Sequence, residues 1–107
     1  MKPKRRFAII YDPDVKQHLK FIERRYYSLI RTTIESQLQF EPEVETKNRK
    51  PLTRPVEFEA EWELRFGSDD RFRVFYQTNM EHSEVLVLAI GVKKGNRLWI
   101  GGKEVKL

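Results

Sequence analysis

The sequence of 107 residues contains no cysteine and no hydrophobic run long enough for a transmembrane helix. The lack of cysteine excludes disulfides, thiolate zinc sites and thiol nucleophiles, and it suits a reducing cytoplasm. The apolar stretch at residues 7–10, which follows a basic start, is too short for the hydrophobic region of a signal peptide. We therefore expect a cytoplasmic protein that does not associate with membranes.

The sequence also has few of the patterns that mark conventional catalytic sites. Its two histidines, His18 and His82, have no serine or carboxylate partner at a suggestive spacing, and we place His18 on a helix surface and His82 in a tight turn. It contains no metal-ligand cluster, glycine-rich phosphate loop or nucleotide-binding strand–turn–helix. We expect no metal and no cofactor, so any catalysis has to use Arg, Lys, Glu, Tyr or Trp.

Charge, by contrast, is abundant. Charged residues make up 35% of the chain, and the net charge is +5. A positive field of this size attracts polyanions, of which nucleic acid is the commonest in a cell. A surface that is basic only for solubility is the alternative. The length and the absence of internal repeats predict one domain that spans residues 1–107.

Hydrophobic periodicity predicts an α+β fold. Residues 6–11 read as a strand, and a helical region begins at Asp12-Pro13, breaks near residues 24–27 and ends by Glu41-Pro42. Residues 43–56 lack periodicity, and we expect a basic loop there. Further strands are expected at residues 61–67, 71–78, 84–93 and 97–100. The N-terminal strand and the two-helix segment should pack with these strands as a small, mainly antiparallel sheet.

Alternation along two of these strands predicts how they pair. The residues that must face one core are Trp62, Leu64 and Phe66 on the first strand, and Phe72, Val74 and Tyr76 on the second. In this register residues 68–70 form the turn, and Arg65 lies opposite Arg73 on the other face. Like charges directly across a ladder are destabilising. The pair therefore needs an anion, either Glu63, which lies diagonal to Arg73, or a bound phosphate.

Two interpretations of this charged face remain open. In the first, five residues form a solvated lattice of salt bridges: Glu61, Glu63, Arg65, Arg71 and Arg73. In the second, the face is a groove that tracks phosphates, and further cations converge on it. The nucleic-acid-binding residues predicted on this basis are Lys47, Arg49, Lys50, Arg54, Arg71, Lys93 and Arg97.

Several segments have a distinctive order and spacing: Trp62-Glu-Leu-Arg-Phe-Gly67, Arg71-Phe-Arg-Val-Phe-Tyr76 and Ala89-Ile-Gly-Val-Lys-Lys94, preceded by Asn48-Arg-Lys-Pro-Leu52 and followed by Asn96-Arg-Leu-Trp-Ile-Gly-Gly102. Together they resemble the RelE/ParE toxins of bacterial type II toxin–antitoxin systems over most of the chain. The resemblance implies a RelE-like fold and an acidic antitoxin as partner. Toxins of the RelE branch are ribonucleases that cleave mRNA on the ribosome, with the RNA 2′-hydroxyl as nucleophile and basic side chains in place of an acid–base pair.

The resemblance also implies catalytic roles by position. Arg73 matches the strand arginine that contacts the scissile phosphate. Arg65 matches a basic position on the preceding strand, and Lys94 matches the basic residue after the central strand. Trp99, or Ile100 by strict spacing, falls near the aromatic residue that stacks on or orients a base.

Two departures from the family pattern bear on function. Glu63 falls where the RelE branch has a second lysine, and it would act instead as a general base. Trp99 replaces a tyrosine, so it can stack on a base but cannot donate a phenolic proton. The ParE branch shares the fold, lacks the ribonuclease residues and poisons DNA gyrase, and an inactive module that only binds the antitoxin is a third possibility. The basic face favours the ribonuclease over the gyrase inhibitor.

Overall fold

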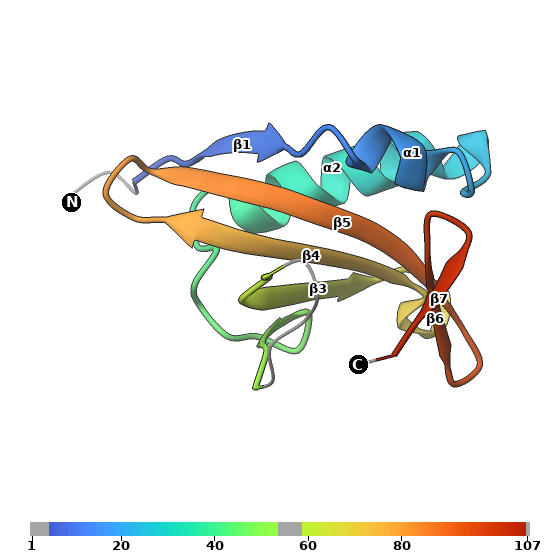
Figure 1. The fold of residues 1–107 in the computed structure, drawn as a ribbon. Helices are drawn as coiled ribbons and strands as arrows, with labels where there is room; N and C mark the ends of the chain where they lie inside the picture. Colours follow the sequence, from blue (N-terminus) through green and yellow to red (C-terminus); the bar gives the residue numbers. More distant parts are fainter. Residues whose placement is uncertain (1–4, 54–58, 107) are drawn as a thin grey trace.

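The computed structural model of the chain describes residues 5–53 and 59–106. Its fold combines two α-helices with one sheet, which has the strand order β2-β3-β4-β5-β6-β7 (Figure 1). Neighbouring strands on this path are antiparallel, and β1 lies off the path and pairs with β5 in parallel. The predicted α+β architecture with a mainly antiparallel sheet is confirmed.

The elements in chain order are β1 (Ala8–Tyr11), α1 (Val15–Leu19), the 3₁₀ turn η1 (Arg24–Tyr26), α2 (Tyr27–Leu38), β2 (Arg49–Pro51), β3 (Trp62–Phe66), the 3₁₀ turn η2 (Ser68–Asp70), β4 (Phe72–Asn79), β5 (Glu84–Lys94), β6 (Arg97–Ile100) and β7 (Lys103–Val105). The predicted strands and the break between the helices lie close to their expected positions. No helix in the described ranges has the length and apolarity that crossing a bilayer requires.

Two strands lie where none was predicted. β2 occupies part of the segment 43–56, which we expected to be a loop, and β7 follows the turn at Gly101 and Gly102. Each has three residues and lies at an edge of the sheet path. Three residues are too few to show an alternating pattern in the sequence. Each of these strands is defined by its pairing with a neighbouring strand.

Helix α1 begins later than predicted. The Asp12 carboxylate accepts a hydrogen bond of 2.9 Å from the backbone N–H of Asp14, two residues on. This Asx-type turn uses the aspartate before the helix starts. The first residue of α1 is therefore Val15, which is buried in the core.

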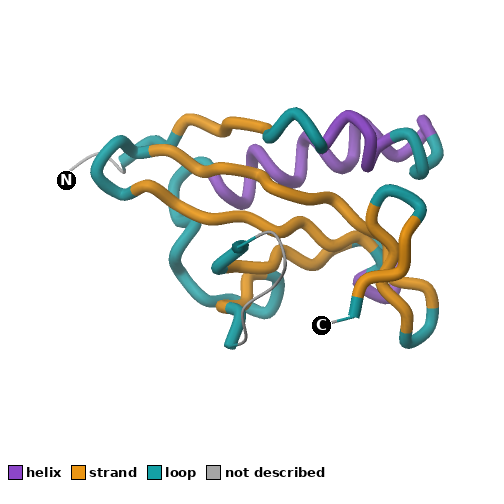
Figure 2. Tube along the Cα trace, viewed as in Figure 1, coloured by secondary structure: helices purple, strands orange, loops and turns teal. Residues whose placement is uncertain are grey.

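Both helices lie on one side of the sheet, and the hairpin β6–β7 stands across the far end of β5 (Figures 1 and 2). The main core fills the space between helices and sheet and includes Ile34, Leu38, Leu64, Val74 and Tyr76. A smaller apolar cluster lies on the opposite face of the sheet and consists of Ala60, Phe75, Ala89, Leu98 and Ile100. The two clusters cover β5 on both faces, as its apolar sequence predicted.

One edge of β5 is shared by two strands. β1 pairs with residues 84–87 of β5, and β6 pairs with residues 91–94. In the gap between these ladders, the N–H of Ile90 donates a hydrogen bond of 3.3 Å to Nδ1 of His18 in α1. His18 is therefore half-buried against the sheet, and the prediction that it lies on the surface is wrong. Burial lowers the pKa of its imidazole, while the nearby Asp14 and Asp12 act in the opposite direction.

Candidate nucleic-acid interface

The sheet face opposite the helices carries a groove of about 660 Å³. Strands β2 to β5 form one side of it, and the hairpin β6–β7 forms the other. Among the residues that the structure describes, six cations and two anions line it: Lys50, Arg65, Arg73, Lys93, Arg97, Lys106, Glu63 and Glu104. These residues give the groove a formal net charge of +4.

The floor of the groove is built by the predicted pairing of β3 with β4. All five pairs have the expected register, from Trp62 opposite Tyr76 to Phe66 opposite Phe72, and Arg65 lies opposite Arg73. With the core residues facing the helices, alternation sends both arginines to the groove face. The requirement that apolar residues share a core therefore also places the two guanidinium groups side by side.

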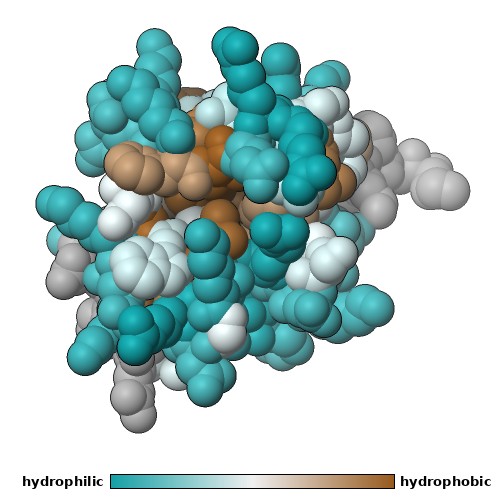
Figure 3. Space-filling model, turned by 90° about the vertical axis from the view of Figure 1, so that its right-hand side faces the viewer, coloured by the Kyte–Doolittle hydropathy of each residue, from teal (hydrophilic) through white to brown (hydrophobic). Residues whose placement is uncertain are grey.

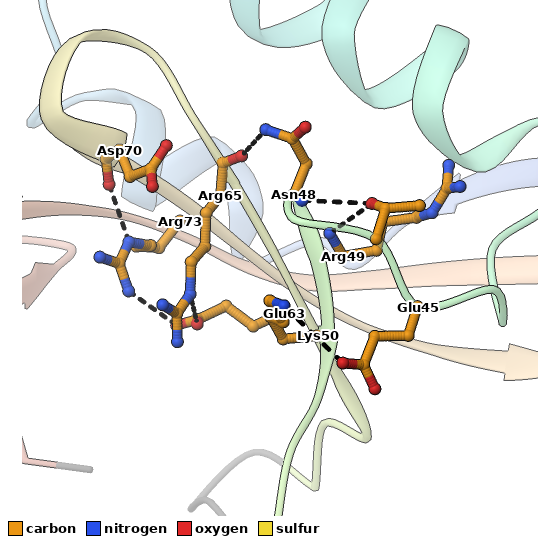
Figure 4. A network of polar contacts seen from close by, with 9 residues as sticks. Glu45, Asn48, Arg49, Lys50, Glu63, Arg65, Asp70 and Arg73 are labelled. Carbon is orange, nitrogen blue, oxygen red and sulfur yellow. Dashed lines mark hydrogen bonds and ion pairs between the residues drawn. The ribbon is translucent and has the colours of Figure 1, made fainter.

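Glu63 supplies the anion that this pair needs. Nε of Arg65 donates to Oε1 of Glu63 at 2.5 Å, and Nη1 of Arg73 lies 3.4 Å from Oε2 of the same carboxylate (Figure 4). The Glu63 side chain is 1% exposed. One buried carboxylate cannot neutralise two guanidinium groups, so the three side chains together keep one positive charge in a fixed position. A lattice of salt bridges is thus present here, and its Glu63 and Arg73 side chains are buried rather than solvated.

Backbone contacts also hold the two arginines in place. Nε of Arg73 donates to the backbone oxygen of Asp70 in η2 at 2.8 Å. The main chain of Arg65 is held by Asn48, whose backbone oxygen accepts from the Arg65 N–H and whose side-chain amide donates to the Arg65 oxygen, both at 2.8 Å. The Arg65 side chain is 39% exposed, whereas that of Arg73 is 8% exposed. Arg65 is therefore the more accessible donor, and Arg73 lies deeper in the floor.

Three other predicted cations line the same groove. Lys50 of β2 lies 3.7 Å from a Glu45 oxygen, and Arg97 of β6 lies 3.8 Å from a Glu104 oxygen. Lys93 comes from the end of β5. Lys106 joins them, although the sequence analysis did not single it out. It follows β7, and without that strand there was no reason to place it near the groove.

Arg49 does not reach the groove. Its guanidinium donates to the backbone oxygens of Gln37 at 2.6 Å and Val44 at 2.9 Å, and the residue is 7% exposed. Figure 4 shows its side chain pointing away from Arg65 and Arg73. Arg49 is paired with Leu64 across β2 and β3, so alternation directs it to the helix side. The sequence analysis expected Arg49 to lie with the other cations because it assigned a loop, without alternating faces, to this segment; the structure places Arg49 on the opposite side of the sheet.

Lys94 and Trp99 also lie apart from the arginine pair. They line a smaller cleft that includes His18 and Phe21, at the end of the molecule where β6 and β7 stand. Figure 3 views this end of the molecule and shows hydrophobic residues gathered in a small patch within a hydrophilic surface. Lys93 and Leu98 line the groove, whereas Lys94 and Trp99 line the smaller cleft. Matching family positions by spacing did not show that these residues lie at different openings.

Ile100, the alternative to Trp99 by strict spacing, lies in the core and is not aromatic. Ile100 is 8% exposed and belongs to the small core cluster beneath the hairpin.

Lys47 is exposed in the turn before β2 and does not line the groove. Arg54 lies outside the described residues. Arg71 lines a neighbouring cleft that shares Lys93 with the groove.

Comparison with known proteins gives a fold and no sequence family. No family model and no curated protein sequence matches the chain. The chain has an α+β architecture, with helices on one face of a mainly antiparallel sheet and a basic groove on the other. A solved structure with this fold is a chain of the toxin–antitoxin complex RelBE2 from Mycobacterium tuberculosis, with a TM-score of 0.66 and 20% sequence identity over 82% of this chain and 99% of that chain. At this identity the similarity concerns the fold, and function has to be argued from the site.

Proposed function

We propose that this chain is the toxin of a type II toxin–antitoxin pair and that its groove binds and cleaves mRNA. The observation that carries the proposal is the pair of guanidinium groups from Arg65 and Arg73, held by buried Glu63 in the floor of a groove with net charge +4. Planar guanidinium groups suit phosphate oxygens. The similarity to a chain of a toxin–antitoxin complex supports the assignment as a toxin.

In the proposed reaction the 2′-hydroxyl of one nucleotide attacks the adjacent phosphorus. The O2′–P bond forms and the P–O5′ bond breaks, which leaves a 2′,3′-cyclic phosphate and a 5′-hydroxyl. Negative charge develops on the non-bridging oxygens in the transition state, where Arg65 and Arg73 would donate hydrogen bonds. Donors that are already in place need no reorganisation during the reaction, and such stabilisation is commonly the largest catalytic contribution.

Glu63 acts in this proposal as a positioning residue. Each of its carboxylate oxygens already contacts a guanidinium group, and its side chain is buried. A general base must reach the proton that it removes, and the contacts of Glu63 direct it toward the arginines instead. Lys50 and Lys93 line the groove as well. In the proposed step the 2′-hydroxyl loses its proton to solvent water, and the ammonium group of Lys50 or Lys93 gives a proton to the departing O5′.

The same groove suits a peptide with many carboxylates. An antitoxin with an acidic segment that folds on this surface would offset the charge of the groove and block access of RNA to it. This partner, the mRNA and the ribosome together place the proposed activity in the bacterial cytoplasm.

Induction of the protein in bacteria that lack its partner tests the proposal. The wild type should arrest growth and translation, and Arg65→Ala should relieve the arrest. Arg31→Ala, which removes the same charge from the exposed Arg31–Glu35 pair on α2, should remain toxic. Normal growth with the wild-type protein accumulating would contradict a toxin of either branch. Loss of DNA supercoiling with intact mRNA would assign the chain to the gyrase inhibitors instead.

A further inference from the structure

A second basic cleft adjoins the groove at the end where β4 begins and β5 ends. It has a volume of about 360 Å³ and is lined by Ser68, Asp69, Arg71, Lys93 and Gly95. Lys93 also lines the groove, so the two openings are neighbours. We propose that this cleft is a second phosphate subsite, which binds the backbone of single-stranded RNA beyond the scissile phosphate. The inference rests on the proposed function of the groove.

The guanidinium of Arg71 is held in place by aromatic rings. It lies 5.0 Å from the ring centre of Tyr26 and 5.3 Å from that of Phe72, and Nη1 is 3.3 Å from the Tyr26 hydroxyl. The two rings are themselves in contact, with centres 5.1 Å apart, and Phe72 belongs to the main core. The hydrogen bond to Tyr26 uses one of the five N–H donors of the guanidinium, and the others remain for a phosphate.

The backbone brings Arg71 and Lys93 together. The N–H of Lys93 donates to the backbone oxygen of Arg71 at 2.7 Å. This bond ties the start of β4 to the end of β5, and it places both cations at the same cleft. The turn η2 that precedes Arg71 also supplies the Asp70 oxygen that holds Arg73 in the groove. The backbone around η2 therefore positions Arg73 in the groove, through Asp70, and Lys93 at the cleft, through Arg71.

The cations of the cleft have fewer carboxylates close to them than the cations of the groove have. Arg65 and Arg73 share Glu63, and Lys50 and Arg97 each have a carboxylate within 4 Å. Within residues 5–53 and 59–106, neither Arg71 nor Lys93 forms an ion pair. Of the described residues that line the cleft, Asp69 is the one carboxylate, and together with Arg71 and Lys93 it gives a net charge of +1. Two cations that form no ion pair within these ranges, one of them held against aromatic rings, favour an external anion.

The position of Lys93 predicts the path of the RNA. An RNA strand whose scissile phosphate lies at Arg65 and Arg73 would continue past Lys93. A phosphate further along the same RNA would then contact Arg71. Single-stranded nucleic acid is commonly bound by such a row of cations along its backbone. An RNA that is long enough to span both openings should therefore bind more tightly than one that fills the groove alone.

The test compares two 2′-O-methyl RNAs, which have no 2′-hydroxyl to react: a dinucleotide and an octanucleotide. Arg71→Ala should weaken octanucleotide binding about tenfold, and it should lower the slope of log affinity against log salt by about 0.7, the value for one phosphate contact of a single strand. Dinucleotide binding, followed by NMR titration, should not change. Arg31→Ala removes the same charge on α2, and neither RNA should lose affinity through it beyond a small general effect.

Equal losses for Arg71→Ala and Arg31→Ala would overturn the subsite, and so would equal weakening of both RNAs by Arg71→Ala. Thermal melting checks that the variants fold. If loss of packing on Tyr26 unfolds Arg71→Ala, Arg71→Gln keeps most of the side chain and should show the same dependence on RNA length. A wild-type protein that binds neither RNA would contradict the proposed function together with the subsite. Dinucleotide binding that requires Arg65 but no effect of residue 71 would contradict the subsite alone.

Discussion

Glu63 is a buried carboxylate with a guanidinium group at each oxygen. Removal of one partner from a buried ion pair leaves uncompensated charge in a medium that solvates it poorly. In Glu63→Gln, two guanidinium groups would face each other across β3 and β4 without an anion. We expect this substitution to lower the free energy of unfolding by about 3–5 kcal/mol, as measured by urea denaturation.

Glu61→Gln is the matched control for this substitution. Glu61 lies two residues away and is exposed, and it accepts a hydrogen bond of 3.4 Å from the Thr78 N–H. The control should change stability by no more than about 0.5 kcal/mol, as is usual at surface positions. Equal stability of the two variants would show that Glu63 is not needed to compensate Arg65 and Arg73.

Much of the candidate site at this scale follows from the sequence. Alternation of apolar residues placed Arg65 opposite Arg73, and the need for an anion pointed to Glu63. The side chains of Arg49 and Trp99 could not be placed in this way. The face that each occupies depends on the pairing of a short strand, and residue type alone does not determine a register.

At the scale of elements, α1 is joined to β5 by the hydrogen bond from the Ile90 N–H to His18. Burial lowers the pKa of His18 in the folded protein below its ordinary value of 6.5, which the unfolded chain retains. The unfolded state therefore binds the proton more readily. The stability that the His18 contact contributes should be fully present above pH 6.5, and it should be lost as the pH falls from that value through the lower pKa of the folded state.

Urea unfolding at a series of pH values tests this expectation with two variants. His18→Gln should lose the part of the pH dependence that lies just below pH 6.5. His82→Gln should keep it, because His82 is exposed in the turn between β4 and β5. The same pH dependence in the wild type and in His18→Gln would show that the contact with Ile90 does not respond to protonation.

The spacing of β5 and β6 depends on Gly91. A Cβ at this position would lie 2.8 Å from Cγ1 of Ile100 and 2.8 Å from the backbone oxygen of Trp99. Gly91→Ala should therefore push the hairpin β6–β7 away from β5 and cost about 1–3 kcal/mol, as overpacking commonly does. NMR amide shifts of Ile100 and Trp99 should move as well.

Gly95→Ala provides the comparison for Gly91→Ala. Gly95 has a φ of +61°, and a Cβ there meets nothing within 4 Å. Its cost of about 1–2 kcal/mol should come from backbone strain confined to the turn. The amides of Ile100 and Trp99 should then keep their shifts. If Gly91→Ala also leaves them unchanged, the close approach of the two strands does not require glycine.

The sequence predicted long elements well and short ones poorly. β3, β4 and β5 carry enough alternating or continuous apolar residues to reveal their faces. β2 and β7 have three residues each and depend on neighbours that are distant in sequence or follow a glycine turn. The groove lies between these two edge strands, so its width and its lining by Lys106 became visible only in the folded chain.

At the scale of the whole molecule, charge is distributed unevenly, and the groove has a net charge of +4. This distribution predicts a small acidic protein as partner. Affinity capture from the native host at moderate salt should recover one such protein, and high salt should weaken the complex because the contact depends on charge. Recovery of nucleic acid or ribosomes without an acidic protein would argue against a dedicated antitoxin.

Cleavage of ribosome-bound mRNA by the purified protein tests the central claim most directly. The wild type should cut RNA, and a 2′-deoxy nucleotide at the cleavage position should block the cut because the nucleophile is missing. Arg65→Ala should slow the reaction by about 10²–10³-fold, the usual effect of removing one preorganised donor, while the protein stays folded. Cleavage that is unaffected by Arg65→Ala, or that continues at the 2′-deoxy position, would contradict the account.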